Sequence, residues 1–284
     1  MAEREFFRDR AGIERHWQQR LERARLPAML DIVKKRKTRM LTSATESGGC
    51  TTRMTAQGRQ ALIAGLCVLA FLATQVFQHL ALWIWIPAPR NLRDELLTYA
   101  LPVDQARAML VLIGLILLIV PYCVVALRYG KAAPLASLLG LIFGTAFIGF
   151  ETASRSLEYF LVGQQWSYQM FSGIDAHDAV LERYALWKAM SPSWVFPLRL
   201  SALVSSCAFA VAIREQGFWR RLGQFAFALN ALRLLGRFLA TFAAQHWLDS
   251  FNNRLYFPVV FVINAMLSVW FFYLAKESSA DPAL

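Results

Sequence analysis

The stretch Met109-Leu-Val-Leu-Ile-Gly-Leu-Ile-Leu-Leu-Ile-Val120 contains no charged or hydrogen-bonding side chain. It forms the middle of an apolar segment that runs from about Ala106 to Leu127. A helix needs about 20 predominantly apolar residues to cross the hydrocarbon core of a bilayer, and this segment has that length. The stretch therefore predicts a transmembrane helix.

Five further apolar segments of similar length surround this one. The chain has 284 residues, of which 57% are hydrophobic, and its mean hydropathy is +0.38. Soluble domains average about 45–50% apolar residues, and the excess here is concentrated in these segments. The sequence therefore predicts an all-α transmembrane helix bundle with six spans. The spans lie approximately at 61–86, 106–127, 134–162, 192–213, 222–245 and 257–275.

Residues 1–57 form a basic arm and linker before the first span. Residues 1–60 carry 14 Lys and Arg residues against 7 Asp and Glu residues. Basic charge next to a span favours a cytoplasmic location and contact with anionic membrane lipid. No recognisable nucleic-acid-binding module accompanies this charge, which argues against a nucleic-acid partner. A second interpretation is that the native protein starts at Met54, immediately before the first apolar run.

The charges of the connecting segments predict the topology. The short loops Arg128–Lys131 and Arg214–Arg221 are basic, whereas the opposite loops, including a long outer loop at 164–191, are mixed or acidic. By the positive-inside rule, the membrane domain at 58–276 has both termini in the cytoplasm, including the tail at 277–284. This layout fits a multi-pass protein of the bacterial inner membrane. The fifth segment has one polar stripe, so it either spans the bilayer, which we favour, or lies on its surface.

Ionisable residues inside the predicted spans are the strongest functional signal. A charge at mid-bilayer costs at least ~2.5–3.5 kcal/mol, so it usually faces the protein interior and has a partner. Glu151, Arg155 and Glu158 are spaced i, i+4 and i+7, which places them on one helix face and predicts a Glu151–Arg155 pair. At ~1.5 Å of rise per residue from the middle of each segment, polar residues of five spans lie at a similar depth in the bilayer. The second span has no charge in its interior and is predicted to face lipid. The candidate ligand-binding residues are Glu151, Arg155, Glu158, Arg199, Asn230, Arg233, Arg237 and Asn264.

This polar layer predicts a site for an anion. Its four arginines face two glutamates, which leaves about two positive charges uncompensated, and buried unpaired charge is unfavourable. Guanidinium groups bind carboxylate or phosphate through two parallel hydrogen bonds, so a lipid head group or a small anionic solute fits. Two alternatives need no ligand. Either the Glu–Arg pairs only fix helix packing, or the third span ends at Phe150 and residues Glu151 to Tyr159 form an external helical extension whose charges are solvated.

Other chemistry is largely missing from the sequence. No catalytic or nucleotide-binding motif is present, and the histidines and cysteines lack the spacing of a metal site. We therefore predict no catalytic residue, no metal and no cofactor. Gly140 and Gly144 are spaced for close helix packing. Pro121, Pro197 and Pro258 lie near the predicted span ends, so the broken-helix pattern of transporters gains no support.

The layout from Gly58 to Ala275 resembles an uncharacterised bacterial family of six-span integral membrane proteins. Two spans precede the short basic turn Arg128-Tyr-Gly-Lys131, and a third span ends in the charged run Glu151 to Glu158. A long external loop and three closely spaced spans follow. The resemblance implies the six-span architecture and brings no activity with it.

Three functions remain open at this stage. The first is binding or transport of a small anionic or amphiphilic ligand through the arginine-rich layer. The second is a non-catalytic accessory or sensor role, in which the outer loop and the basic arm are interaction surfaces. The third is an intramembrane lipid-modifying enzyme with Glu151 or Glu158 as acid or base. It ranks last because neighbouring arginines lower a carboxyl pKa, whereas this chemistry needs a raised one.

Overall fold

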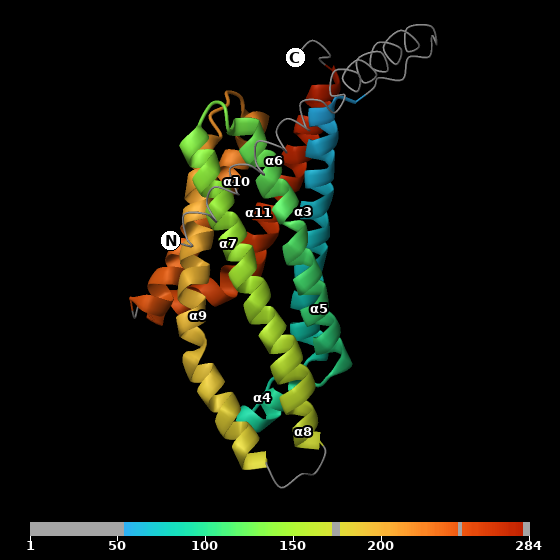
Figure 1. Cartoon of the computed structure of the whole chain (residues 1–284), viewed down its shortest axis with the longest axis vertical. Coiled ribbons are helices and arrows are strands. Elements are labelled where there is room, and N and C mark those ends of the chain that lie inside the picture. Colours follow the sequence, from blue (N-terminus) through green and yellow to red (C-terminus); the bar gives the residue numbers. More distant parts are fainter. Residues whose placement is uncertain (1–53, 172–176, 244–245, 281–284) are drawn as a thin grey trace, which may run out of the picture. The chain divides into compact units, whose positions relative to one another are not determined.

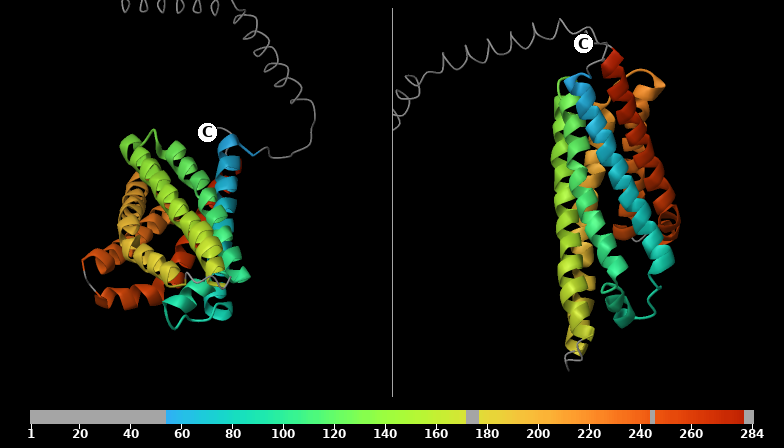
Figure 2. Two further views of the ribbon diagram at one scale, coloured as in Figure 1. Left: turned by 60° about the horizontal axis from the view of Figure 1, so that its bottom comes forward. Right: turned by 90° about the vertical axis from the view of Figure 1, so that its right-hand side faces the viewer.

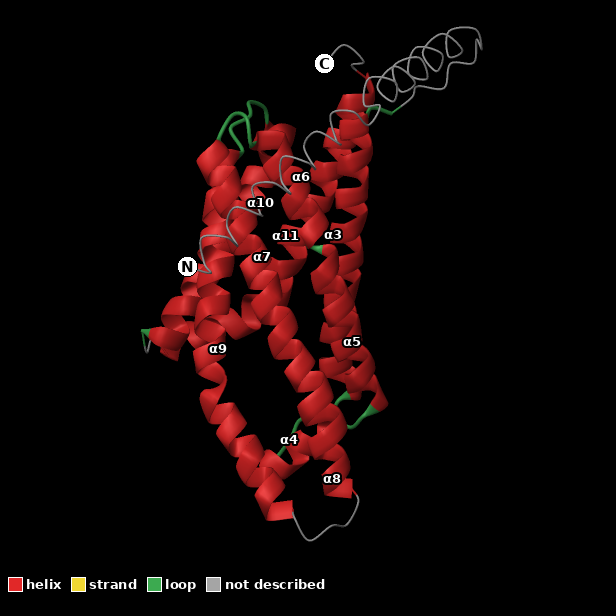
Figure 3. Ribbon diagram, in the orientation of Figure 1, coloured by secondary structure: helices red, strands yellow, loops and turns green. Residues whose placement is uncertain are grey.

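The computed structural model describes residues 54–171, 177–243 and 246–280, and nearly all of them are helical (Figures 1 and 3). No strand occurs in these ranges. The predicted N-terminal arm lies outside the described residues, apart from its last few residues. In chain order the elements are α3 (Ala56–Leu80), η1 (Ala81–Trp85), α4 (Leu92–Thr98), α5 (Pro102–Leu117), α6 (Ile119–Tyr129), α7 (Pro134–Leu157), η2 (Glu158–Trp166), α8 (Ser167–Phe171), α9 (His177–Ala212), α10 (Phe218–Phe242) and α11 (His246–Ala280).

Six helical segments are long and apolar enough to cross a membrane. Three of them combine several elements, namely α3 with η1, α5 with α6, and α7 with η2 and α8. The other three are α9, α10 and the C-terminal part of α11. The fifth predicted span corresponds to α10, whose 25 residues suffice by length and composition. The predicted all-α architecture with six such helices is therefore confirmed.

Successive helices alternate in direction, so several chain segments meet at one end of the bundle, at the top of Figure 1. A Cβ atom at Gly58 in α3 would lie 3.2 Å from the carbonyl oxygen of Ala275 in α11. The hydroxyl of Tyr129, the last residue of α6, donates a 2.8 Å hydrogen bond to Glu215, which follows α9. We call this the joined end of the bundle. It holds both basic loops, as expected for loops on one side of a membrane.

Small residues let the helices approach closely, as their spacing predicted. A Cβ atom at Gly140 would lie 2.6 Å from the ring of Phe209 in α9, and one at Gly144 would lie 2.6 Å from the ring of Tyr122 in α6. The buried carbonyl of Gly140 accepts a 2.8 Å hydrogen bond from Ser205 Oγ. The predicted close-packing role of Gly140 and Gly144 is therefore confirmed.

Most of the predicted outer loop at 164–191 is helical, because the chain is helical up to Phe171 and again from His177 (Figure 2). Val162 and Met170 form a buried apolar cluster with Val180, and Leu96 of α4 and Tyr184 of α9 complete it. The helical segments before and after residues 172–176 contribute side chains to this cluster. Residues 172–176 themselves lie outside the described part. α7 continues without a break past Phe150 to Leu157, as expected both for a longer span and for a helix that extends beyond the bilayer.

Pro121 and Pro197 lie inside helical segments, as do Pro192 and Pro258. Pro121 follows a break at Leu118, between α5 and α6 and well inside the second span. Pro197 lies inside α9, together with Pro192. A proline removes one backbone hydrogen bond from a helix and clashes with the preceding turn. Ser191 Oγ donates a 2.8 Å hydrogen bond to the Lys188 carbonyl, which Pro192 leaves without its helical donor.

Candidate functional site

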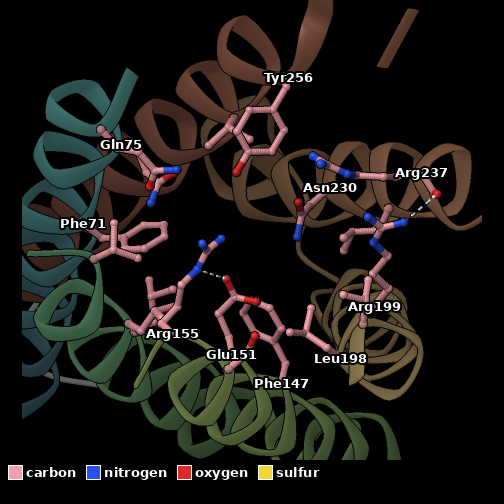
Figure 4. Close-up of a pocket in the computed structure, with 18 of the residues that line it drawn as sticks. Phe71, Gln75, Phe147, Glu151, Arg155, Leu198, Arg199, Asn230, Arg237 and Tyr256 are labelled. Carbon is pink, nitrogen blue, oxygen red and sulfur yellow. Dashed lines mark hydrogen bonds and ion pairs between the residues drawn. The ribbon is translucent and has the colours of Figure 1, made fainter. Parts of the chain in front are cut away.

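One cavity of about 400 Å³ lies inside the bundle, and all eight candidate residues from the sequence line it (Figure 4). Every one of the six spans contributes to its walls. The sequence therefore identified residues that the fold brings together. They come from the third to sixth spans, and the first and second spans line the cavity with other residues. The eight residues are Glu151, Arg155, Glu158, Arg199, Asn230, Arg233, Arg237 and Asn264.

One wall of the cavity is a network of ion pairs that begins on α7. Arg155 Nε lies 3.0 Å from Glu151 Oε1, and Arg155 Nη1 lies 2.6 Å from Glu158 Oε2. Both distances are those of charge-assisted hydrogen bonds. The predicted pair between Glu151 and Arg155 is confirmed, and the same guanidinium also holds the second carboxylate.

The second span extends this network, so the prediction that this span only faces lipid is wrong. Arg107 Nε lies 2.7 Å from Asp104 Oδ1, and Arg107 Nη2 lies 3.6 Å from Glu158 Oε1. Both Asp104 and Arg107 are buried. The sequence signal for an ion pair was the i, i+3 spacing of Asp104 and Arg107. Both residues lie at the start of the span, where charged side chains are expected at the membrane interface. We call Asp104, Arg107, Glu151, Arg155 and Glu158 the ion-pair network.

The local backbone changes where this network meets the helix. At Glu158 the α-helical pattern of α7 gives way to the π-helical pattern of η2, and Glu158 itself is buried. Single π-helical turns are frequent at functional sites because they displace side chains from the regular helix face. Next to this turn, Tyr99 lies in the segment between α4 and α5. Burial and the nearby Glu158 carboxylate raise the pKa of Tyr99 to about 12, so Tyr99 keeps its proton at neutral pH.

The opposite wall of the cavity is basic and comes mainly from α10. Arg233 Nε and Nη2 donate hydrogen bonds of 3.2 and 3.0 Å to Asn230 Oδ1. The guanidinium carbons of Arg233 and Arg237 lie 5.6 and 4.9 Å from the centre of the Tyr256 ring, within cation–π range. Arg199 of α9 donates a 3.2 Å hydrogen bond to the Arg237 carbonyl. We call Arg199, Asn230, Arg233 and Arg237 the basic wall.

Within the described residues, Arg233 and Arg237 form no ion pair with a carboxylate. Figure 4 shows the side chains of Glu151 and Arg155 on one side of the cavity and those of Arg199, Asn230 and Arg237 on the other. Five basic and three acidic side chains line the cavity in the described part of the chain, a formal excess of two positive charges. This excess equals the one expected from the sequence.

The rest of the cavity combines apolar side chains with a polar outer end. Phe71 and Phe147 contribute apolar surface, and the buried amide of Gln75 faces the ion-pair network in Figure 4. Away from the joined end, Lys188 and Glu95 form an ion pair of 2.6 Å that is partly exposed to solvent. The cavity therefore has polar groups for a charged head and apolar surface for an attached hydrocarbon.

Asn264 lies in the cavity wall but makes its hydrogen bond within its own helix. Its amide nitrogen donates a 2.8 Å bond to the Val260 carbonyl. Tyr256, Arg107 and Asp104 belong to the site but were not predicted as site residues. No group of histidine, cysteine and acidic side chains that could hold a metal occurs in the described part of the chain.

Comparison with protein-family models, curated proteins and solved structures finds no match to this chain.

Proposed function

We propose that this protein is a multi-pass membrane protein that binds a small anionic or amphiphilic ligand in the cavity between its six spans. The observation that carries the proposal is the pair Arg233 and Arg237, two intramembrane guanidinium groups beside a cavity and without a carboxylate partner among the described residues. Positive charge in this environment is costly unless an anion balances it. The guanidinium fork binds carboxylate and phosphate groups through two hydrogen bonds.

The ion-pair network supports the same proposal from the other side of the cavity. Arg155 and Arg107 already hold Glu151, Glu158 and Asp104, so these carboxylates are engaged away from the basic wall. Because these carboxylates pair with Arg107 and Arg155, the guanidinium groups of Arg233 and Arg237 are available to bind an external anion. We place the protein in the bacterial inner membrane as part of this proposal, and the basic loops at the joined end favour an orientation with both termini in the cytoplasm.

Transport of the ligand is a second candidate, which the positions of the prolines favour. Pro121 lines the cavity, and Pro197 is next to the cavity-lining Leu198. Transporters bind their substrates where helices are interrupted near mid-membrane. The break at Leu118 and the prolines of α9 therefore place weakened helical backbone beside the proposed ligand.

Native mass spectrometry of the protein in a mild detergent tests the proposal. We expect the wild type to retain an anionic species and to bind added inorganic phosphate. The variant Arg233→Gln/Arg237→Gln should lose both, because it removes the two guanidinium groups and keeps hydrogen-bonding side chains of similar shape. The variant Arg233→Lys/Arg237→Lys keeps the charge without the bidentate geometry, and we expect binding weakened by about tenfold.

The matched control is Arg214→Gln/Arg221→Gln, which removes the same charge from exposed positions at the joined end. It should bind like the wild type. A wild-type protein that retains no anion and binds no phosphate would refute the proposal. Unchanged binding in Arg233→Gln/Arg237→Gln would mean that the anion binds elsewhere in the molecule.

A further inference from the structure

Two contacts join α7 and its continuation η2 to α9, and the cavity lies between these contacts. Near the joined end, Gly140 of α7 packs against Phe209 of α9. At the other end, Val162 of η2 and Tyr184 of α9 share a buried cluster. Between these contacts the two helices run well apart, as Figures 1 and 3 show.

The helix faces that touch near the joined end line the cavity further along. Ser191 precedes Phe209 by 18 residues, about five helical turns, so the two residues share one face of α9. Ser154 follows Gly140 by 14 residues, about four turns, so these two residues share one face of α7. Both serines line the cavity. We call the space between Ser154 and Ser191 the α7–α9 window.

The outer surface of both helices at this level is apolar. Phe150 and Leu157 on α7 are 42% and 40% exposed, and Met190 and Trp194 on α9 are 48% and 51% exposed. Surfaces of this kind are stable against hydrocarbon chains and unfavourable against water. The window therefore lies between an apolar exterior and a cavity that has a basic wall.

We infer that the ligand is an amphiphile with a phosphomonoester head group, whose head binds at the basic wall and whose chains leave the cavity through the α7–α9 window. This inference rests on the proposed function. A phosphomonoester carries a charge of about −1.5 to −2 at pH 7, which matches the formal excess of two positive charges around the cavity. Its oxygens can each accept from a guanidinium group, so Arg233 and Arg237 can bind it together.

The size of the cavity explains why the chains must leave it. Its volume of about 400 Å³ is near the lower end of the range of about 300–1,000 Å³ for small-ligand sites. It can hold a phosphorylated head group with the first part of a chain, and two complete acyl chains would not fit. The apolar surface outside the window gives the remaining hydrocarbon a place in the bilayer.

Window-blocking variants test the inference with two probes, dioleoyl phosphatidate and inorganic phosphate, each titrated into the full chain in a mild detergent. The variants Ser154→Trp and Ser191→Trp place a large side chain in the window from opposite helices. We expect each to weaken phosphatidate binding by about tenfold or more and phosphate binding by less than about threefold. The matched controls Ala153→Trp and Ala189→Trp, at exposed neighbouring positions, should leave both affinities unchanged.

A second measurement uses the unmodified protein and so does not depend on the folding of a variant. A phosphatidate analogue with a photoreactive group in its acyl chain should label peptides from 147–158 of α7 and from 187–199 of α9. Labelling confined to other helices would overturn the inference, as would phosphatidate affinity unchanged in both window variants.

The outcomes separate this inference from the function on which it rests. If phosphate binds and depends on Arg233 and Arg237 but phosphatidate does not bind, the inference fails and the proposed function stands. If neither probe binds to the wild type, both fail.

Discussion

Replacement of Arg155 by methionine should destabilise the protein strongly. Arg155 is the guanidinium that holds both Glu151 and Glu158, and the variant would leave these two carboxylates in the cavity wall without it. Removing one partner of a buried ion pair costs about 3–5 kcal/mol. Because the Arg155 side chain is 30% exposed, we expect the lower end of this range, about 3 kcal/mol. The free energy of unfolding in detergent measures the effect.

Two further variants show whether the loss comes from uncompensated charge. In Glu151→Gln/Arg155→Met/Glu158→Gln the carboxylates are neutral, and we expect most of the stability to return. Arg220→Met breaks the exposed ion pair with Glu277 at the joined end and should leave the stability close to that of the wild type. If the triple variant is as unstable as Arg155→Met alone, packing of the arginine side chain explains the loss and the charge argument is wrong.

Replacement of Gly140 by leucine should also destabilise the protein strongly. A Cβ atom there would lie 2.6 Å from the ring of Phe209, which is fully buried and also packs against Tyr122 and Phe227. The ring has no free space into which it could turn, so α7 and α9 must separate. Overpacking of a tight core costs about 1–3 kcal/mol, and we expect the upper end of that range for Gly140→Leu. Thermal unfolding in detergent measures the difference.

Gly149 provides a matched control on the same helix. A Cβ atom at Gly149 would meet no other atom within 4 Å. Since glycine is less favourable than leucine inside a helix by somewhat under about 1 kcal/mol, Gly149→Leu should be neutral or slightly stabilising. Equal losses in Gly140→Leu and Gly149→Leu would mean that backbone effects dominate and that the close approach of α7 and α9 is not under steric control.

The part of the site that could be predicted from the sequence consists of charges deep inside apolar segments. Depth along a helix follows directly from residue count, so Glu151, Arg199 and Arg237 could be placed in one layer before the helix packing was known. The pair between Glu151 and Arg155 followed from helical spacing alone. These inferences need only the geometry of single helices.

The parts of the structure that the sequence did not predict depend on contacts between helices, and the spacing of residues along one helix does not show such contacts. Asp104 and Arg107 lie at the start of an otherwise apolar span, where charge is common at the membrane surface. Only the packing of α5 against η2 brings Arg107 to Glu158 and buries it. The helical ends of the predicted outer loop were missed for the same reason, since Val180 and Tyr184 find their apolar partners on other elements.

The length of α9 has a consequence for what the protein presents to water. A hydrocarbon core of about 30 Å accommodates about 20 residues of helix, whereas α9 has 36. This helix is therefore longer than one crossing of the bilayer requires. The end of α9 with Tyr184, together with α4 and α8, has its own apolar core around Leu96 and Val162. In a bilayer crossed by α9, this cluster of helix ends would form a small folded unit at the membrane surface, opposite the joined end.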